Sequence, residues 1–284
     1  MVNLIFVCLG IELLAGVQPA NAAPSEISSM KRILVLGDSL SDGFGLKRSE
    51  AYPALLVEKL RAAGLNYEVI NASQSGGTTT GGLRRLPLHL KHKSASRTDS
   101  SRGEIDIFIL ELGINDAFMG VPIDQIRNNL QEIIDQVKAH NPDARIVIVG
   151  MRLPNYSTDD YMHAFGQIYV DLAAKNRAAL VPYLLEGVGG DPSLNLPDRI
   201  HPNAAGQKIL AENVWQILEP IAREVAALSS RAQARDLTFS PRSRNQACVI
   251  LGICEVLHSV QDDRACGRTI RATRPRSVRR TLDK

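Results

Sequence analysis

Two segments near opposite ends of the chain carry the side chains that nucleophilic catalysis needs. The first, GDSLSDGFG, begins at Gly37 and places Ser39 just after the apolar run RILVLG. The second, DRIHPN, holds His201 three residues after Asp198. A serine hydroxyl is a poor nucleophile at neutral pH and needs a base, which in turn needs an orienting group. At this spacing in a loop, Asp198 can accept the Nδ1 proton of His201 and leave Nε2 facing Ser39.

Three further groups could stabilise the oxyanion that forms when a serine attacks a carbonyl carbon. They are the backbone N–H of Ser39, the backbone N–H of Gly76 in NASQSGG, and the side-chain amide of Asn115 in GIND. Glycine at position 76 has no Cβ to keep a substrate oxygen away from its amide. Asn115 is neutral and can donate a hydrogen bond, which an aspartate could not do.

The remaining polar residues of these segments favour structural roles. Small, hydroxylic and acidic residues suit any turn that leaves a strand, so Ser39 taken alone could belong to a simple bend. Asp38 is expected to cap a turn and Asp42 to make a loop hydrogen bond. Ser41 is expected to help hold Ser39 in place, and Asp116 to accept hydrogen bonds from loop amides.

Alternating apolar and amphipathic segments between Lys31 and about Arg223 indicate an α/β fold. Five apolar runs lack polar alternation, which is typical of strands buried on both faces, and helical patterns lie between them. The sequence predicts a single-domain, three-layer α/β/α sandwich with about five parallel strands, joined by right-handed crossovers. Function in such folds collects on loops at the carboxyl ends of strands. The expected strands are 32–37, 67–71, 105–113, 145–150 and 179–184, and the expected helices are 51–63, 82–92, 123–140, 159–176 and 204–217.

The two ends of the 284-residue chain differ from this middle part in composition. An apolar run over residues 4–17, followed by Ala20-Asn21-Ala22, predicts an export signal over residues 1–22 and no transmembrane anchor. Residues 231–284 carry twelve basic and five acidic side chains, a net charge of +7, which leaves −4 for residues 1–230 out of the total of +3. The basic character therefore belongs to the tail. The expected organisation is a signal over 1–22, a hydrolase-type domain over 30–226 and a disordered basic tail over 227–284.

Two other features bear on this organisation. The cysteines, Cys8, Cys248, Cys254 and Cys266, all lie outside the predicted domain, so no disulfide or thiol chemistry is expected in it. The polar segment 93–103 is expected to form a surface loop at the amino end of a strand, away from the catalytic loops.

Four motifs in order resemble the blocks of the GDSL or SGNH hydrolase superfamily. They are GDSL, Gly76 in NASQSGG, Asn115 in GIND and DRIHPN, and the resemblance covers about Lys31 to Ala222. It is greatest to the bacterial thioesterase I, arylesterase and lysophospholipase group, which shares the patterns NAS-x-SG, ELG-x-ND and LP-x-NY. The resemblance implies a flavodoxin-like fold without a lid. It also implies Ser39 as nucleophile, His201 as base, Asp198 as its orienter, and an oxyanion hole formed by Ser39, Gly76 and Asn115.

The function expected from these residues is that of a secreted or periplasmic serine esterase of broad specificity. Its substrates would be small-molecule esters with short to medium acyl chains, including aryl esters, acyl thioesters or lysophospholipids. The chemistry requires no metal or organic cofactor, and no specific nucleic-acid partner is expected. Two alternatives stay open: a carbohydrate O-deacetylase, and a non-catalytic binding protein whose basic tail contacts an anionic surface. The sequence leaves the acyl chain length, the leaving group and the oligomeric state open.

Overall fold

The structure is a computed structural model that describes residues 30–90, 104–153 and 159–238. The predicted export signal, the polar segment 93–103 and residues 239–284 of the predicted tail lie outside these ranges. The chain divides into two units, residues 1–230 and 231–284, and the whole sheet belongs to the first.

A five-stranded sheet forms the centre of the fold, in the order β2-β1-β3-β4-β5, and every neighbouring pair is parallel. This confirms the predicted α/β architecture and number of strands. The chain adds β2 on one side of β1 and then β3, β4 and β5 on the other, so the strand order reverses between β1 and β3. Ligands of open parallel sheets bind at such a reversal. The strands are β1 (Lys31–Leu36), β2 (Tyr67–Asn71), β3 (Ile107–Leu110), β4 (Arg145–Val149) and β5 (Ala179–Val181).

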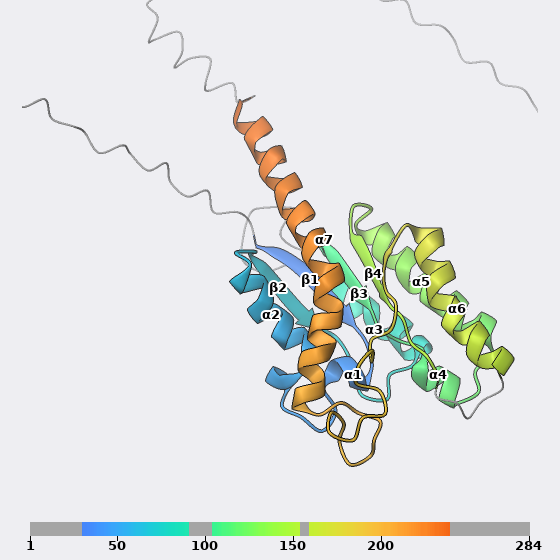
Figure 1. The fold of residues 1–284 in the computed structure, drawn as a ribbon. Coiled ribbons are helices and arrows are strands. Elements are labelled where there is room, and N and C mark those ends of the chain that lie inside the picture. Colours follow the sequence, from blue (N-terminus) through green and yellow to red (C-terminus); the bar gives the residue numbers. More distant parts are fainter. Residues whose placement is uncertain (1–29, 91–103, 154–158, 239–284) are drawn as a thin grey trace, which may run out of the picture. The chain divides into compact units, whose positions relative to one another are not determined.

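Helices cover both faces of the sheet and complete the three layers. Figure 1 shows α2 and α7 on one face, with α3, α5 and α6 on the other. α5 shows why these segments are helical, because its buried residues recur every three or four positions, as a helix packed on a sheet requires. The helices that cover the sheet are α2 (Tyr52–Ala62), α3 (Thr79–Leu90), α5 (Ile123–His140), α6 (Asp159–Asn176) and α7 (Ala204–Thr238).

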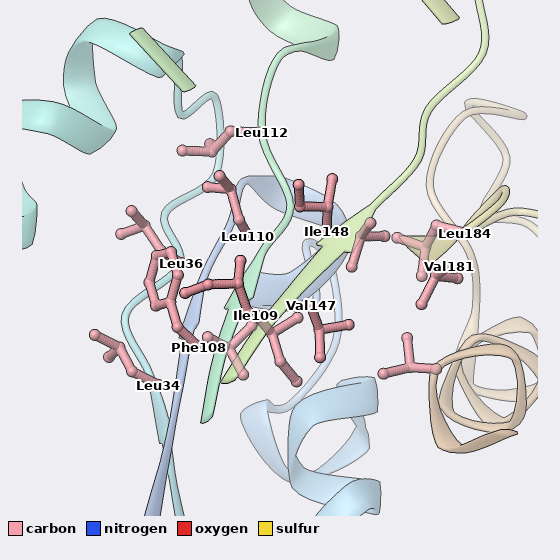
Figure 2. Close-up of a cluster of buried hydrophobic side chains, with 14 of the residues drawn as sticks. Leu34, Leu36, Phe108, Ile109, Leu110, Leu112, Val147, Ile148, Val181 and Leu184 are labelled. Carbon is pink, nitrogen blue, oxygen red and sulfur yellow. The ribbon is translucent and has the colours of Figure 1, made fainter. Parts of the chain in front are cut away.

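Branched aliphatic side chains of adjacent strands form the core between these layers. Leu34 and Leu36 of β1 lie beside Phe108 and Leu110 of β3, and Figure 2 shows them continuing towards Ile148 and its neighbours. The register pairs Leu36 with Leu110. The segments that follow these two strands therefore leave the sheet side by side, at the edge where the chemistry was predicted.

Three short helices were not predicted, and two of them carry residues of the candidate site. α1 (Ser39–Asp42) follows β1, η1 (Arg48–Glu50) precedes α2, and α4 (Ile114–Phe118) follows β3. Elements this short complete too few turns to show a hydrophobic period. They nevertheless decide where the ends of β1 and β3 direct their polar side chains.

The last helix is much longer than the predicted range 204–217. α7 continues through Pro220 to Thr238, so the first twelve residues of the predicted tail, 227–238, are helical. Proline normally ends or kinks a helix because it removes one hydrogen bond. Here Leu218, Ile221 and Ala222 keep the apolar face of the helix buried on either side of the proline. Within the described residues, no helix has both the length and the apolar character needed to cross a bilayer.

Candidate active site

Ser39 opens a one-turn helix just beyond strand β1. The side chain of Asp38 caps this helix, as predicted, by accepting a hydrogen bond from the Leu40 N–H at 3.0 Å. Gly43 ends the turn with a φ of 79°, a left-handed conformation that glycine adopts without steric cost. Ser39 is thus held on a short capped turn with 8% of its surface exposed.

His201 lies against Ser39, although 162 positions separate them in the sequence. Its Nε2 is 3.0 Å from the Oγ of Ser39, and its Nδ1 is 2.8 Å from the Oδ2 of Asp198. A single neutral tautomer satisfies both contacts, with Nδ1–H donating to the carboxylate and Nε2 accepting from the serine. The structure therefore brings together the serine, histidine and aspartate that the sequence predicted as a catalytic set.

The turn between Asp198 and His201 presents the carboxylate to the imidazole ring. Oδ1 of Asp198 accepts hydrogen bonds from the N–H groups of Ile200 at 2.9 Å and His201 at 3.0 Å. Arg199, which follows Asp198 in this turn, has a φ of 59°, which a non-glycine residue seldom adopts. Burial raises the pKa of Asp198, but hydrogen bonds from His201 and Ile200 outweigh this and lower that pKa to about 2. The group is therefore ionised throughout the neutral range.

Gln207 connects the helix that follows the histidine loop to the serine turn. It lies in the first turns of α7 and is 1% exposed. Its Oε1 accepts a hydrogen bond from the Tyr52 N–H at 2.8 Å, and its Nε2 donates to the Leu40 carbonyl at 3.1 Å. Glutamine is common on helix surfaces, so nothing in the sequence indicated this bridge.

We expect Gln207→Leu to lower the free energy of unfolding by about 2–4 kcal/mol, because it deprives a buried N–H and a buried carbonyl of their hydrogen bonds. Urea unfolding followed by circular dichroism measures this change. Gln167→Leu is the matched control, since Gln167 is exposed on α6 and, among the described residues, its side chain bonds only to Asp171 in the same helix. Equal midpoints for the two variants would contradict the role of Gln207.

The ring of Phe44 packs against the imidazole of His201, the candidate base. Its ring centroid is 4.4 Å from that of His201, the two planes meet at 39°, and 47% of the residue is exposed. The aromatic face restricts the imidazole and can stabilise the imidazolium that forms when His201 takes a proton. Phe44 was not predicted from the sequence, in which its only signal is that it is a large aromatic residue within a turn of small polar ones.

We expect Phe44→Leu to lower kcat for p-nitrophenyl butyrate by about three- to tenfold, since aromatic contacts of this kind contribute about 0.5–1.5 kcal/mol. Steady-state kinetics measure the change. Val170→Ala is a suitable control, because it removes an exposed apolar side chain of α6. A kcat for Phe44→Leu equal to that of the wild type would show that the ring does not support the histidine.

The predicted oxyanion donors also lie at this edge of the sheet. The Nδ2 of Asn115 donates to the Gly77 carbonyl at 2.9 Å and to the Oδ2 of Asp38 at 3.3 Å. Two acceptors on the same side fix the amide with its nitrogen towards the serine turn. Among the described residues, the N–H groups of Ser39 and Gly76 have no hydrogen-bond acceptor, so both could donate to a substrate oxygen.

Two carboxylates hold the loop that contains Gly76. Oδ2 of Asp42 accepts hydrogen bonds from the Ser75 N–H at 3.1 Å and hydroxyl at 2.7 Å. Asp116 accepts from the Thr79 N–H at 2.8 Å and hydroxyl at 2.6 Å. These are the structural roles predicted for both aspartates. Gly76 itself has a φ of 73°, and a Cβ there would meet no protein atom within 4 Å. Its backbone conformation is therefore a second reason for glycine, beside the predicted access to its amide.

Several known proteins are similar to this chain in sequence and in fold. A model of the GDSL-like lipase/acylhydrolase family matches residues 35–209. Esterase TesA of Pseudomonas aeruginosa is 37% identical over 194 residues, which cover 68% of this chain and 90% of that protein. The arylesterase of Vibrio mimicus is 35% identical, with 66% of this chain and 88% of that protein covered.

Two further comparisons agree with these. Thioesterase 1/protease 1/lysophospholipase L1 of Escherichia coli is 35% identical and covers 66% of this chain and 84% of its own length. The crystal structure of TesA superposes with a TM-score of 0.61 at 38% identity, covering 67% of this chain and 99% of that one. The residues that the family model matches, 35–209, include all four motifs.

Proposed function

The chain belongs to the GDSL-like lipase/acylhydrolase family and is a carboxylic ester hydrolase, and we propose that Ser39 is its nucleophile. The observation that carries the proposal is the continuous contact from Ser39 Oγ through His201 to Asp198. The substrates are small-molecule esters of short- to medium-chain acids, accepted with broad specificity.

In the proposed reaction, Nε2 of His201 takes the hydroxyl proton while Oγ of Ser39 attacks the carbonyl carbon. Negative charge develops on the carbonyl oxygen, and the N–H groups of Ser39 and Gly76 and the amide of Asn115 donate to it. The imidazolium then protonates the leaving group. Water, activated by the same histidine, releases the acid from the acyl-enzyme.

Covalent labelling tests this assignment. The purified protein should hydrolyse p-nitrophenyl butyrate, and an alkyl phosphonate ester should inactivate it with one equivalent bound. Peptide mass spectrometry should find the phosphonate on Ser39, because its hydroxyl has a base within 3.0 Å. A label on another serine, or complete inactivation without any label, would contradict the proposal.

The names of the relatives suggest which leaving groups to compare. Proteins about 35% identical to this chain include an arylesterase and a thioesterase 1/lysophospholipase L1. We infer that aryl esters, acyl thioesters and lysophospholipids are all candidate substrates. A panel of p-nitrophenyl esters from acetate to palmitate, phenyl acetate, palmitoyl-CoA and a lysophosphatidylcholine would rank them by kcat/KM.

Export is part of the same proposal and rests on the sequence alone. The apolar run over residues 4–17 and Ala20-Asn21-Ala22 favour cleavage after Ala22. N-terminal mass spectrometry of protein recovered from a periplasmic or culture fraction should find Ala23 as the first residue. Recovery of the uncleaved chain from the cytoplasm alone would contradict it.

A further inference from the structure

Two buried carboxyl groups lie directly behind the serine turn. Asp38 precedes Ser39, and Glu111 follows the last residue of β3. Both residues are 0% exposed. The pairing of Leu36 with Leu110 places them side by side, and the Asp38 N–H donates to Oε2 of Glu111 at 3.1 Å. The mechanism described above uses neither group.

The hydrogen bonds around Glu111 indicate its protonation state. Its Oε2 accepts from the Asp38 N–H and from the Ser41 hydroxyl at 2.5 Å. Since the Ser41 proton is used in that bond, the Tyr52 hydroxyl is the donor in the 2.8 Å contact with Ser41. Oε1 of Glu111 is buried and accepts no hydrogen bond from the described residues. Burial of an ionised carboxylate oxygen without a donor is unfavourable, whereas a protonated oxygen becomes a donor itself.

The hydrogen bonds around Asp38 indicate the opposite state. Its Oδ1 accepts from the Leu40 N–H, and its Oδ2 accepts from the Asn115 amide. Arg85 lies nearby, with Nη2 donating to the Gly37 carbonyl at 2.6 Å, and its charge can balance one carboxylate. Burial raises the pKa of Glu111 well above its usual range and that of Asp38 to about 6. The negative charge of Asp38 also raises the pKa of Glu111, whereas the hydrogen bond from the Leu40 N–H lowers that of Asp38.

We propose that Glu111 is protonated at neutral pH and donates a hydrogen bond to an ionised Asp38, and that this buried pair positions Asn115 and the Ser39 turn. A close approach supports it, because a Cβ on Gly37 would come within 2.5 Å of both Glu111 Oε2 and Ser41 Oγ. The glycine of GDSL therefore leaves room for the Glu111 carboxyl.

The pair acts on catalysis through Asn115. An ionised Asp38 can only accept, so it holds the nitrogen of the Asn115 amide, and not its oxygen, towards the serine turn. Both N–H groups of this amide are engaged, and the longer bond, 3.3 Å to Asp38, is the one that an oxyanion can replace. Asp38 and Glu111 are thus positioning residues. The positioning role of Asp38 and Glu111 rests on the proposed oxyanion hole. The proposed protonation of Glu111 does not depend on it.

Infrared spectroscopy tests the protonation state without reference to activity. At pH 8, the wild-type protein should show the carbonyl stretch of one protonated carboxylic acid, and Glu111→Gln should lack it. Glu132→Gln, which changes a solvent-facing glutamate of α5, should keep it. A wild-type spectrum without the band, or a band that survives in Glu111→Gln, would overturn the proposal.

Kinetics with the full chain test the positioning role. In Glu111→Gln the amide can replace the donor to Asp38 and still accept both bonds, so kcat should stay within about threefold of the wild type. Glu111→Leu should lower kcat per titrated active site by about 10- to 100-fold with little change in KM, as expected when an oxyanion donor is misplaced. Asp38→Asn should lower kcat by a similar factor, because the NH₂ group of the new amide faces the NH₂ group of Asn115 and cannot accept its hydrogen bond. A wild-type kcat in Asp38→Asn would overturn the positioning role.

Stability provides a further measurement if Glu111→Leu fails to fold. A pKa above the unfolded value of 4.5 means that wild-type stability falls as pH rises from about 4.5 towards the folded-state pKa. Asp38, Arg85 and Tyr52 also face this site and are present in both proteins, whereas the titrating carboxyl of Glu111 is present only in the wild type. The urea midpoint of Glu111→Gln relative to wild type should therefore be higher at pH 8 than at pH 4. A difference that does not vary with pH would overturn the protonated state.

Discussion

Replacing Ser39 with alanine is expected to lower kcat for p-nitrophenyl butyrate by about four to six orders of magnitude. The variant keeps every donor of the proposed oxyanion hole but has no oxygen to form the acyl-enzyme, so only weak catalysis by bound water remains. It should fold normally, because the side-chain bond that it removes is the 3.0 Å contact with His201, at the edge of the core. Single-turnover assays with a burst analysis would distinguish loss of acylation from loss of binding.

Ser230→Ala is the matched control for this variant. Ser230 is an exposed serine of α7 whose hydroxyl donates to the Ala226 carbonyl in its own helix and to no other residue that the structure describes. Its kcat and KM should equal those of the wild type. If Ser39→Ala retained more than about 1% of wild-type kcat with no contaminating esterase, Ser39 would not be the nucleophile. Phosphonate labelling should fail in Ser39→Ala and succeed in Ser230→Ala.

The sequence predicted those parts of the fold that repeat a pattern over many residues. The apolar runs around Ile33, Ile109 and Val147 lack polar alternation, and they form central strands buried on both faces. The long helices were also evident, because several turns of an amphipathic period were available. The end of α7 was not evident. Pro220 is a local signal for helix termination, but the helix continues past it because its apolar face stays buried on both sides.

The sequence predicted the residues of the candidate site that lie in recognisable motifs or have distinctive chemistry. His201 stands out because imidazole chemistry suits a base, and Asp198 lies three residues before it. The contacts of Phe44 with His201 and of Glu111 with Ser41 join positions far apart in the chain. Their identities say only that an aromatic residue and an acid are present. Register and side-chain direction decide what they touch, and neither is visible without the folded sheet.

Asp198→Asn should lower kcat by about 10³- to 10⁴-fold, because it forces a choice between two defects. If the amide oxygen keeps the bonds from the N–H groups of Ile200 and His201, the NH₂ faces Nδ1 of His201 and favours the tautomer with the proton on Nε2. That tautomer cannot accept the Ser39 proton. If the amide flips, Nδ1–H has its acceptor, but two backbone donors then face the NH₂ group. Steady-state kinetics with p-nitrophenyl butyrate measure the loss, which should appear in kcat more than in KM.

Asp191→Asn is the control that separates this effect from a change in loop structure. Asp191 makes the same kind of local turn, since its Oδ1 accepts from the Ser193 N–H at 2.8 Å, but it bonds to no histidine in the described part of the chain. Its kcat should therefore match that of the wild type. Asp198→Ala is informative beside it, because water can then solvate Nδ1 and either tautomer is allowed, so this variant should be no less active than Asp198→Asn. An Asn variant clearly more active than the Ala variant would mean that Asp198 supports the loop and does not orient the base.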